Sequence, residues 1–278
     1  MTTLETAPEI VSDAEADAKP EANRMRVAIC FWGICRSLKY TIESIKKNIF
    51  EQLTSFDISY DIYMHTYNVS AIYNNPLAGE NDIFLDNDEY TLLDPDHLKI
   101  ENQKETDKII NFSKYLTKGN PWTGYPETFN NHLRALWSLN EVTKLWVPNK
   151  DKYTHIMYCR PDVLYIQPLK YEFFVNDAIN KNNVLIPYFD LYKGINDRFA
   201  IGNPYTMEIY GSRFNDAYMY SRHFQLHSET YLGAIFKKYN INYAYILFVF
   251  KRVRANGELE KSEPNRYLKI FREMLNSK

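Results

Sequence analysis

The chain has 278 residues, of which 45% are hydrophobic, and its net charge at pH 7 is −2. This composition indicates a folded soluble protein with a real core. Charges of both signs are interspersed, and this distribution argues against a nucleic-acid surface and against a polybasic membrane anchor. We therefore expect a small molecule or a glycan as the partner.

The three cysteines, Cys30, Cys35 and Cys159, are odd in number and have neither CxxC nor zinc-ligand spacing, which favours a reducing compartment. No window approaches 18 consecutive apolar residues, and the first residues lack the order of a signal peptide. These features predict a cytoplasmic protein without a transmembrane segment. Residues 1–24 are acidic and poor in apolar side chains, so we expect a disordered tail before a single domain over residues 25–278.

The first predicted element is a buried strand over Arg26–Phe31, a continuous apolar run. Gly33 permits a tight turn after it, and Ser37 is a candidate cap for a helix whose apolar residues recur at helical spacing from Leu38 to Leu53. A strand, a turn and a helix in this order form half of a βαβ unit.

A second strand is expected over Ile58–His65. One intervening helix favours a parallel pair with a right-handed crossover. The two strand ends then lie at the same edge of the sheet, which would bring together Gly33, Arg36, His65 and Thr66.

The region 68–125 is rich in Asn, Asp and Pro, and we expect loops over the ligand-binding edge, with a short strand at His97–Glu101 and a solvated helix face at Lys104–Lys108. A helix over Thr128–Trp146 should pack on the sheet. Next comes a buried strand over Tyr153–Cys159, which should end before Arg160-Pro161-Asp162 because Pro161 removes a ladder hydrogen bond.

The second half of the chain continues the alternation of strands and helices. We expect a strand at residues 183–187, a turn at Asn196–Gly202 that enters another strand, a helix capped by Ser228 with Glu229 in its first turn, a late strand at Tyr243–Arg254 and a terminal helix at Asn265–Leu275. His223 and His227, four residues apart, could hold a metal only with a third ligand that the sequence does not place.

Arg160 and Asp162 stand at the end of a buried strand, where α/β sheets bind their ligands. A guanidinium group can bind phosphate, and a carboxylate oxygen can bind Mg²⁺ or Mn²⁺. Such a pair can equally be a structural ion pair, and the motif taken by itself does not decide between the two.

Five motifs stand in order over residues 25 to 255: RVAICFWGICRS, DIYMHTY, YCRPDVLYIQPL, NDRFAIGNPYTM and SETYLGAIFKKYNI. In this order they resemble small GT-A-type glycosyltransferases found in bacteria and large DNA viruses. The resemblance implies an α/β, single GT-A-like (Rossmann-like) domain with a central, mostly parallel sheet flanked by helices. It also implies transfer of a sugar from a nucleoside-diphosphate sugar to a hydroxyl of a glycan acceptor, with inversion.

The resemblance also assigns roles around the donor nucleotide. The strand-end residues Gly33, Arg36, His65 and Thr66 would contact the nucleotide or its diphosphate. The Arg160–Asp162 segment would occupy the place of the DxD metal motif. Arg160 replaces the first Asp there, which leaves Asp162 as the sole carboxylate for Mn²⁺ or Mg²⁺ and makes metal dependence doubtful, because Arg160 could take over part of the cation's charge.

In the second half, Gly202 resembles part of the loop beside the donor sugar. Glu229 resembles the general base of inverting members. Its position at a helix start should lower its pKa, so Asp197 stays a rival for the base. Arg252 and Arg254 occupy the place where many GT-A enzymes carry a metal-binding His, and we expect them to contact phosphate.

Several alternatives remain open at this point. His65 can be a structural histidine, Glu229 an ordinary helix-start carboxylate, and Arg252 and Arg254 a solvated face. The whole chain could be a non-catalytic nucleotide-sugar or glycan-binding module of the same fold. A nucleotidyltransferase is disfavoured because no glycine-rich basic loop follows the first strand.

Overall fold

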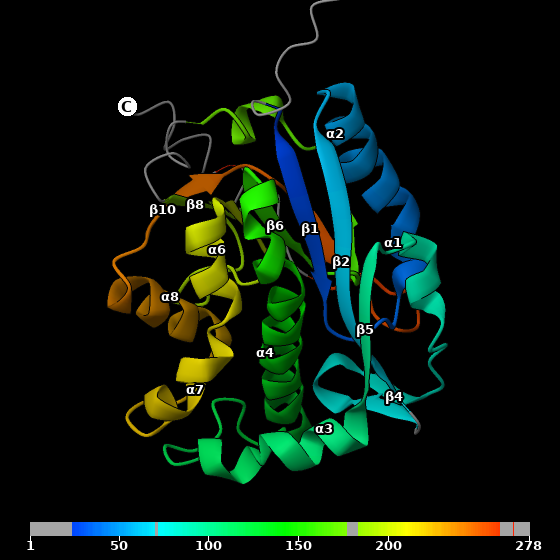
Figure 1. Cartoon of the computed structure of the whole chain (residues 1–278). Helices are drawn as coiled ribbons and strands as arrows, with labels where there is room; N and C mark the ends of the chain where they lie inside the picture. Colours follow the sequence, from blue (N-terminus) through cyan, green and yellow to red (C-terminus); the bar gives the residue numbers. More distant parts are fainter. Residues whose placement is uncertain (1–23, 70–71, 177–182, 262–268, 270–278) are drawn as a thin grey trace, which may run out of the picture.

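The structure is a computed structural model that describes residues 24–69, 72–176, 183–261 and 269. A central sheet runs through the molecule and is flanked by helices (Figure 1). Its strands are β1 (Arg26–Trp32), β2 (Ser59–Asn68), β5 (His97–Asn102), β6 (His155–Cys159), β8 (Asn183–Pro187), β9 (Phe199–Gly202) and β10 (Asn242–Ile246). Their order across the sheet is β10-β8-β9-β6-β1-β2-β5.

The sheet is mostly parallel. Strand β1 pairs in parallel with β2 on one side and with β6 on the other, and β5 extends the sheet in parallel beyond β2. Strand β9 is antiparallel to both of its neighbours, β6 and β8. The predicted α/β fold and the parallel pairing of the first two strands are therefore confirmed, and the carboxyl ends of β1, β2 and β6 lie at one edge of the sheet.

Helices cover both faces of the sheet (Figure 1). They are α1 (Leu38–Ile45), continued by a π-helical segment (Lys46–Phe50) and α2 (Glu51–Ser55), then α3 (Gln103–Ile110), α4 (Pro126–Trp146), α6 (Pro204–Gly211), α7 (Phe214–Ser221) and α8 (Ser228–Lys238). Two small antiparallel pairs accompany the sheet: β3 (Tyr73–Asn75) with β4 (Glu80–Ile83), and β7 (Val163–Tyr165) with β11 (Phe250–Arg252). Short 3₁₀ helices lie at residues 76–78, 89–93, 112–115, 147–152 and 171–173.

Two hydrophobic cores lie on opposite faces of the sheet, and β1 contributes to both. Val27, Ile29 and Phe31 belong to the core formed with α1, α2, β7 and β11. Ala28 and Cys30 belong to the core formed with α4, α6, α7 and α8. Successive side chains of a strand point to opposite faces, so a continuous apolar run is the pattern that a strand covered on both sides requires.

The start of α1 differs from the prediction. Ser37 precedes the helix, but its hydroxyl donates to the carbonyl of Val253 (3.0 Å) and makes no cap. The Glu89 carboxylate accepts instead from the backbone N–H groups of Leu38 (2.8 Å) and Lys39 (3.4 Å). A carboxylate from a distant segment therefore satisfies the helix N-terminus, which a local sequence pattern cannot reveal.

Two further expectations need correction. The late strand predicted over Tyr243–Arg254 is split into β10 and β11, which belong to different sheets. The region 68–125 contains the β3–β4 hairpin, β5 and α3 in addition to loops. The strand expected at residues 97–101 and the exposed face of α3 are confirmed. The predicted tail at residues 1–23 and nearly all of the predicted terminal helix lie outside the described residues.

Among the described helices, none has the length and the apolar character that crossing a bilayer requires.

Candidate active site

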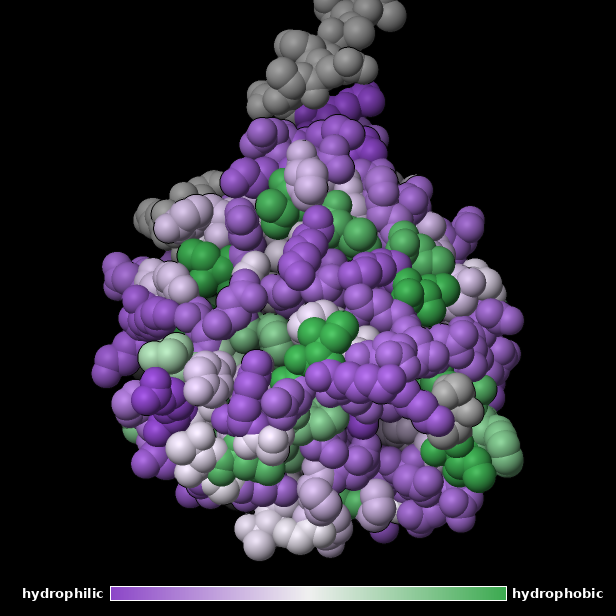
Figure 2. Space-filling model, turned by 60° about the horizontal axis from the view of Figure 1, so that its bottom comes forward, coloured by the Kyte–Doolittle hydropathy of each residue, from purple (hydrophilic) through white to green (hydrophobic). Residues whose placement is uncertain are grey.

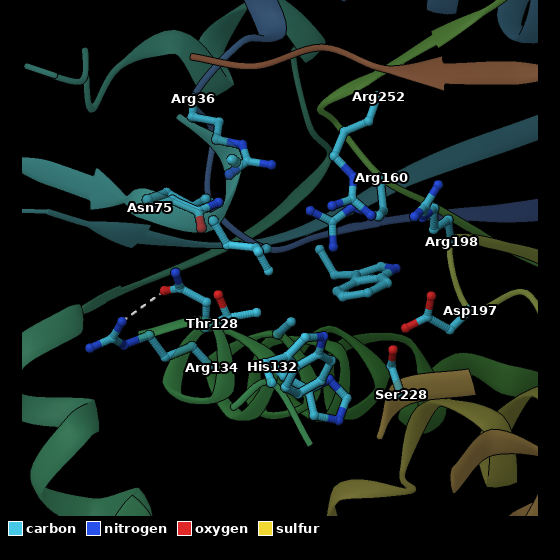
Figure 3. Close-up of a pocket in the computed structure, with 18 of the residues that line it drawn as sticks. Arg36, Asn75, Thr128, His132, Arg134, Arg160, Asp197, Arg198, Ser228 and Arg252 are labelled. Carbon is cyan, nitrogen blue, oxygen red and sulfur yellow. Dashed lines mark hydrogen bonds between the residues drawn. The ribbon is translucent and has the colours of Figure 1, made fainter. Parts of the chain in front are cut away.

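A cavity of about 450 Å³ opens where β1 and β6 end, between the β3–β4 hairpin, the first half of α4 and the start of α8. The face of the molecule that carries these strand ends is mostly hydrophilic, with apolar side chains in small separate groups (Figure 2). Figure 3 shows one wall with Arg36, Arg160, Arg198 and Arg252, and α4 on the other side with Thr128, His132 and Arg134. Strand ends of parallel sheets are the usual place for ligand sites in α/β proteins.

Four arginines from three segments form one wall, and we call them the arginine cluster: Arg160, Arg198, Arg252 and Arg254. Glu260 lies among them, 3.4 Å from Arg198, 3.7 Å from Arg252 and 3.2 Å from Arg254. Burial, together with the like charges of Arg198 and Arg160, lowers the pKa of Arg252 to about 10. The positive charge on this wall is therefore only partly compensated, which is the property of an anion site.

Asp162, predicted as the metal ligand, is fully buried and does not line the cavity. Its Oδ1 accepts from Arg160 Nε (2.7 Å), and its Oδ2 accepts from Arg160 Nη2 (2.8 Å) and Arg36 Nη2 (2.7 Å). Burial alone would raise the pKa of Asp162, but the charges of Arg160 and Arg36 outweigh burial and hold the pKa far below its usual range. Asp162 thus orients two arginines and has no free oxygen for a cation.

Arg36 lines the cavity and is fixed from a second side by Glu80 of the β3–β4 hairpin. The fully buried Glu80 carboxylate accepts from Arg36 Nη1 (3.1 Å), from Asn75 Nδ2 (2.9 Å) and from the backbone N–H of Ala255 (2.7 Å). Arg36 also donates to the Tyr73 hydroxyl. The hairpin, the turn after β1 and the segment after β11 are therefore joined by one carboxylate.

Asp197 and Glu229 face the cavity beside the arginine cluster. The segment before Asp197 packs directly on the first turn of α8, where Ile195 N donates to the carbonyl of Glu229 (3.1 Å). A Cβ on Gly194 would lie 2.2 Å from the carbonyl carbon and oxygen of Glu229, so only glycine permits this approach. This packing holds the two carboxylates near one another.

The environment of Glu229 overturns the expectation that a helix start lowers its pKa. Burial, followed by the negative charge of Asp197, raises the pKa of Glu229 to about 7, and the hydrogen bond from Ser228 only partly opposes this. The predicted cap role of Ser228 is also wrong, because the N-cap is His227 and the Ser228 hydroxyl donates to Glu229. A carboxylate with such a pKa can accept a proton near neutral pH.

The opposite wall, formed by α4, is polar, and the charge of its Arg134 is paired with Asp107 (2.8 Å) and Glu127. Thr128 Oγ1, Asn131 Nδ2, His132 Nε2 and Trp32 Nε1 all belong to cavity-lining residues, and all four atoms are buried without a hydrogen-bond partner among the described residues. Burial lowers the pKa of His132 to about 4, so its imidazole is neutral at pH 7. Buried polar atoms are normally paired, and unpaired ones that line a cavity are available to water or to polar groups of a ligand.

Two predicted contact residues at the end of β2 do not line the cavity. The His65 ring is buried and forms a hydrogen bond through Nδ1 with Ser138 Oγ (2.7 Å), and this hydroxyl accepts from Gly33 N (2.8 Å). Thr66 is buried as well. Since Gly33 lines the cavity, His65 supports the turn after β1 through Ser138 and does not face a ligand.

Gly202, at the end of β9, is the fourth predicted residue away from the cavity, after Asp162, His65 and Thr66. A Cβ there would lie 3.0 Å from Met207 Sδ and Thr206 Oγ1, so the glycine allows β9 to pack against α6. The predicted residues that do meet at the cavity are Gly33, Arg36, Arg160, Asp197, Glu229, Arg252 and Arg254.

Sequence reasoning missed the α4 wall, Arg198 and Glu260. Thr128, Asn131 and His132 are spaced i, i+3 and i+4, so they share one helix face, and this polar face at the start of an otherwise core-packed helix was the signal that could have found them. Arg198 directly follows Asp197 in the NDRFAIG motif. No sequence pattern pointed to Glu260, because the chain reversal that pairs Val253 with Leu259 brings it to the cluster.

Replacing Gly194 with alanine should disturb the carboxylate pair without changing any charged group of the cavity. The added methyl group must push the 194–198 segment away from α8, so we expect a loss of stability of about 1–3 kcal/mol and a large loss of any activity that needs Asp197 and Glu229. Urea unfolding measures the first effect. Gly233→Ala is the matched control, since its Cβ would meet Ile195 only at 3.8 Å; equal effects of both variants would contradict this account.

The protein is therefore an α/β protein with a cavity at the ends of its parallel strands. No protein-family model matches the sequence, and no curated protein matches it. Similar solved structures include mouse xyloside xylosyltransferase 1 in its apo form, which is 11% identical, with 80% of this chain and 84% of that chain covered and a TM-score of 0.36.

Two other solved structures are also similar. A glycosyltransferase involved in glycosylation of the major capsid of PBCV-1 is 8% identical, with 80% of this chain and 81% of that chain covered and a TM-score of 0.38. Core-mannan synthase A from Aspergillus fumigatus, in its Mn/GDP form, is 8% identical, with 94% and 86% covered and a TM-score of 0.43.

Proposed function

We propose that the chain is a glycosyltransferase that moves a sugar from a nucleoside-diphosphate sugar to a hydroxyl of a glycan acceptor. The observation that carries this proposal is the pairing, in one cavity, of the arginine cluster with a buried carboxylate whose pKa is raised. Group transfer from a nucleotide sugar needs a site for the anionic leaving group and a base for the attacking hydroxyl.

The arginine cluster and Arg36 bind the diphosphate. Guanidinium groups form paired, charge-assisted hydrogen bonds with phosphate oxygens. Arg160 is held by Asp162 and also lies over the Trp32 ring, 4.9 Å from its centroid, so its position is fixed before the ligand binds. Positive charge that is fixed in advance stabilises a leaving group as negative charge develops on it.

The reaction is a single displacement. The acceptor oxygen bonds to the anomeric carbon, the bond from that carbon to the phosphate oxygen breaks, and the nucleoside diphosphate leaves toward the arginines. The proton of the acceptor hydroxyl goes to the Glu229 carboxylate, whose raised pKa suits it to take a proton near neutral pH. Displacement from the opposite side inverts the anomeric centre. Asp197 raises the pKa of Glu229 and is the alternative base.

The α4 wall binds the sugar. Thr128, Asn131 and His132 present buried polar atoms that lack partners, and sugar hydroxyl groups can both donate to and accept from them. The Trp122 ring stacks on His227 at the same cavity, with ring centroids 5.2 Å apart, and adds a flat apolar surface. The division into a wall of arginines and an α4 wall of mainly uncharged polar groups matches the two halves of a nucleotide sugar.

A panel of UDP-, GDP- and dTDP-sugars tests the proposal. We expect at least one donor to bind in calorimetry and to release its nucleoside diphosphate, slowly with water and faster with a glycan acceptor. NMR of the product should show the inverted anomer. Binding without turnover of any donor, across a broad acceptor set, would replace the proposal by the non-catalytic module, and a retained anomer would exclude the single displacement.

A further inference from the structure

Asp162, Asp190 and Glu80 are each held in ion pairs with arginines of the cavity. Both oxygens of Asp162 accept guanidinium hydrogen bonds, Asp190 pairs with Arg198, and Glu80 pairs with Arg36. Among the described parts of the chain, no group of three or more His, Cys, Asp or Glu residues could hold a metal ion. Mg²⁺ and Mn²⁺ need oxygen ligands that are free to coordinate. The donor set at the predicted metal position therefore does not fit a divalent cation.

The like charges of the arginine cluster also disfavour a divalent cation. Arg160, Arg198 and Arg252 approach one another closely enough that their like charges oppose the protonated form of Arg252, and Arg252 Nε has no hydrogen-bond partner among the described residues. A divalent cation placed here would add to the repulsion, whereas a phosphate would relieve it.

Glu260 marks where an anion fits. Its carboxylate already contacts Arg198, Arg252 and Arg254, at distances of 3.2 to 3.7 Å that are long for charge-assisted hydrogen bonds. It stands on the segment after β11, where its backbone N–H donates to the carbonyl of Arg252 (2.8 Å). The arginines are therefore spaced to share one anionic group, and Glu260 occupies that place loosely.

We propose that the cavity binds the diphosphate of its donor without a divalent cation, with the guanidinium groups of Arg160, Arg198 and Arg252 in place of the metal. This inference rests on the proposed sugar transfer and specifies which form of the donor the site selects. The bound phosphate displaces the Glu260 carboxylate from the cluster, while Asp162 stays as the positioning residue of Arg160 and Arg36. Mg²⁺ in solution chelates diphosphates and lowers their charge, so it competes with the arginines for the ligand.

Calorimetry with inorganic pyrophosphate and with UDP and GDP on the full chain tests the inference. We expect binding in EDTA and a several-fold weaker affinity in excess Mg²⁺ at matched ionic strength. An affinity that appears only with Mg²⁺, or that Mg²⁺ or Mn²⁺ strengthens tenfold, would overturn the inference.

Three variants test which residues bind pyrophosphate. Arg252→Gln should weaken pyrophosphate binding in EDTA at least tenfold, and Glu260→Gln should strengthen it, because the competing carboxylate is lost. Arg222→Gln, which removes an exposed arginine on α7's far end, is the matched control and should change nothing. Weaker binding by Glu260→Gln, in a variant with the thermal unfolding midpoint of the parent, would contradict the assigned anion position.

The two proposals fail in different ways. If pyrophosphate and the nucleotides bind only with a divalent cation and donors are still turned over, the metal-free site is wrong and sugar transfer stands. If none of them binds with or without the cation, both proposals are wrong.

Discussion

Glu229→Gln should lower the kcat of sugar transfer by about 10²–10⁴, the usual contribution of a general base. Glutamine keeps the size of the side chain but cannot take a proton from the acceptor hydroxyl. Nucleoside-diphosphate binding should stay within a few-fold of the parent, because the arginines that bind it are untouched. Steady-state kinetics and calorimetry on the same preparation measure the two effects, and a variant with full transfer would remove Glu229 from the mechanism.

The pH profile separates Glu229 from Asp197. Because burial and the charge of Asp197 raise the pKa of Glu229 to about 7, the base is increasingly protonated below that pH, and transfer should fall as the pH drops through this range. Asp197→Asn removes the like charge and should move this acid limb to lower pH. If Asp197 is the base instead, Asp197→Asn abolishes transfer, while Glu229→Gln spares most of it.

Asp162→Asn should lower the free energy of unfolding by about 3–5 kcal/mol, the range for breaking a buried ion pair by removing one partner. The side chain is fully buried, and its neutral replacement leaves Arg160 without its carboxylate partner and Arg36 with Glu80 alone. Asparagine keeps the shape, so the loss reports charge rather than a cavity. Urea unfolding at pH 7 measures it.

Asp151→Asn is the matched control, since Asp151 is exposed and its loss should change stability by less than about 0.5 kcal/mol. A metal ligand would behave differently from a buried ion-pair partner. An Asp162→Asn variant with parental stability in EDTA and a specific loss of Mn²⁺-dependent affinity would restore the metal role.

The elements of the sheet could be predicted because their signals are local. The apolar run Arg26–Phe31, the helical spacing after Leu38 and the proline that ends a strand, Pro161, are each patterns of a few neighbouring residues. The structure has β1, α1 and the end of β6 at those places. The prediction of one strand at Tyr243–Arg254 was wrong, because periodicity and β-propensity do not show where a chain leaves one sheet and enters another.

The site was predictable only as a set of residue types. The sequence predicted Arg160 as a phosphate ligand and Asp162 as a metal ligand. In the structure, the Asp162 carboxylate instead turns to Arg160 and to Arg36, and Arg36 is 126 residues away in the sequence. The pKa of Glu229 was misjudged because the helix start was visible in the sequence, whereas the burial and the nearby Asp197 depend on how Gly194 packs against α8.

The contacts that shape the cavity join segments that are far apart along the chain. Glu80 and Ala255 are separated by 175 residues, and Gly33 and Ser138 by 105. Closing such long loops costs conformational entropy, which the packing of the completed fold has to offset. Nascent or truncated chains that stop before Ala255 leave Glu80 without its backbone donor. We therefore expect the proposed anion site to form only when the segment after β11 is in place.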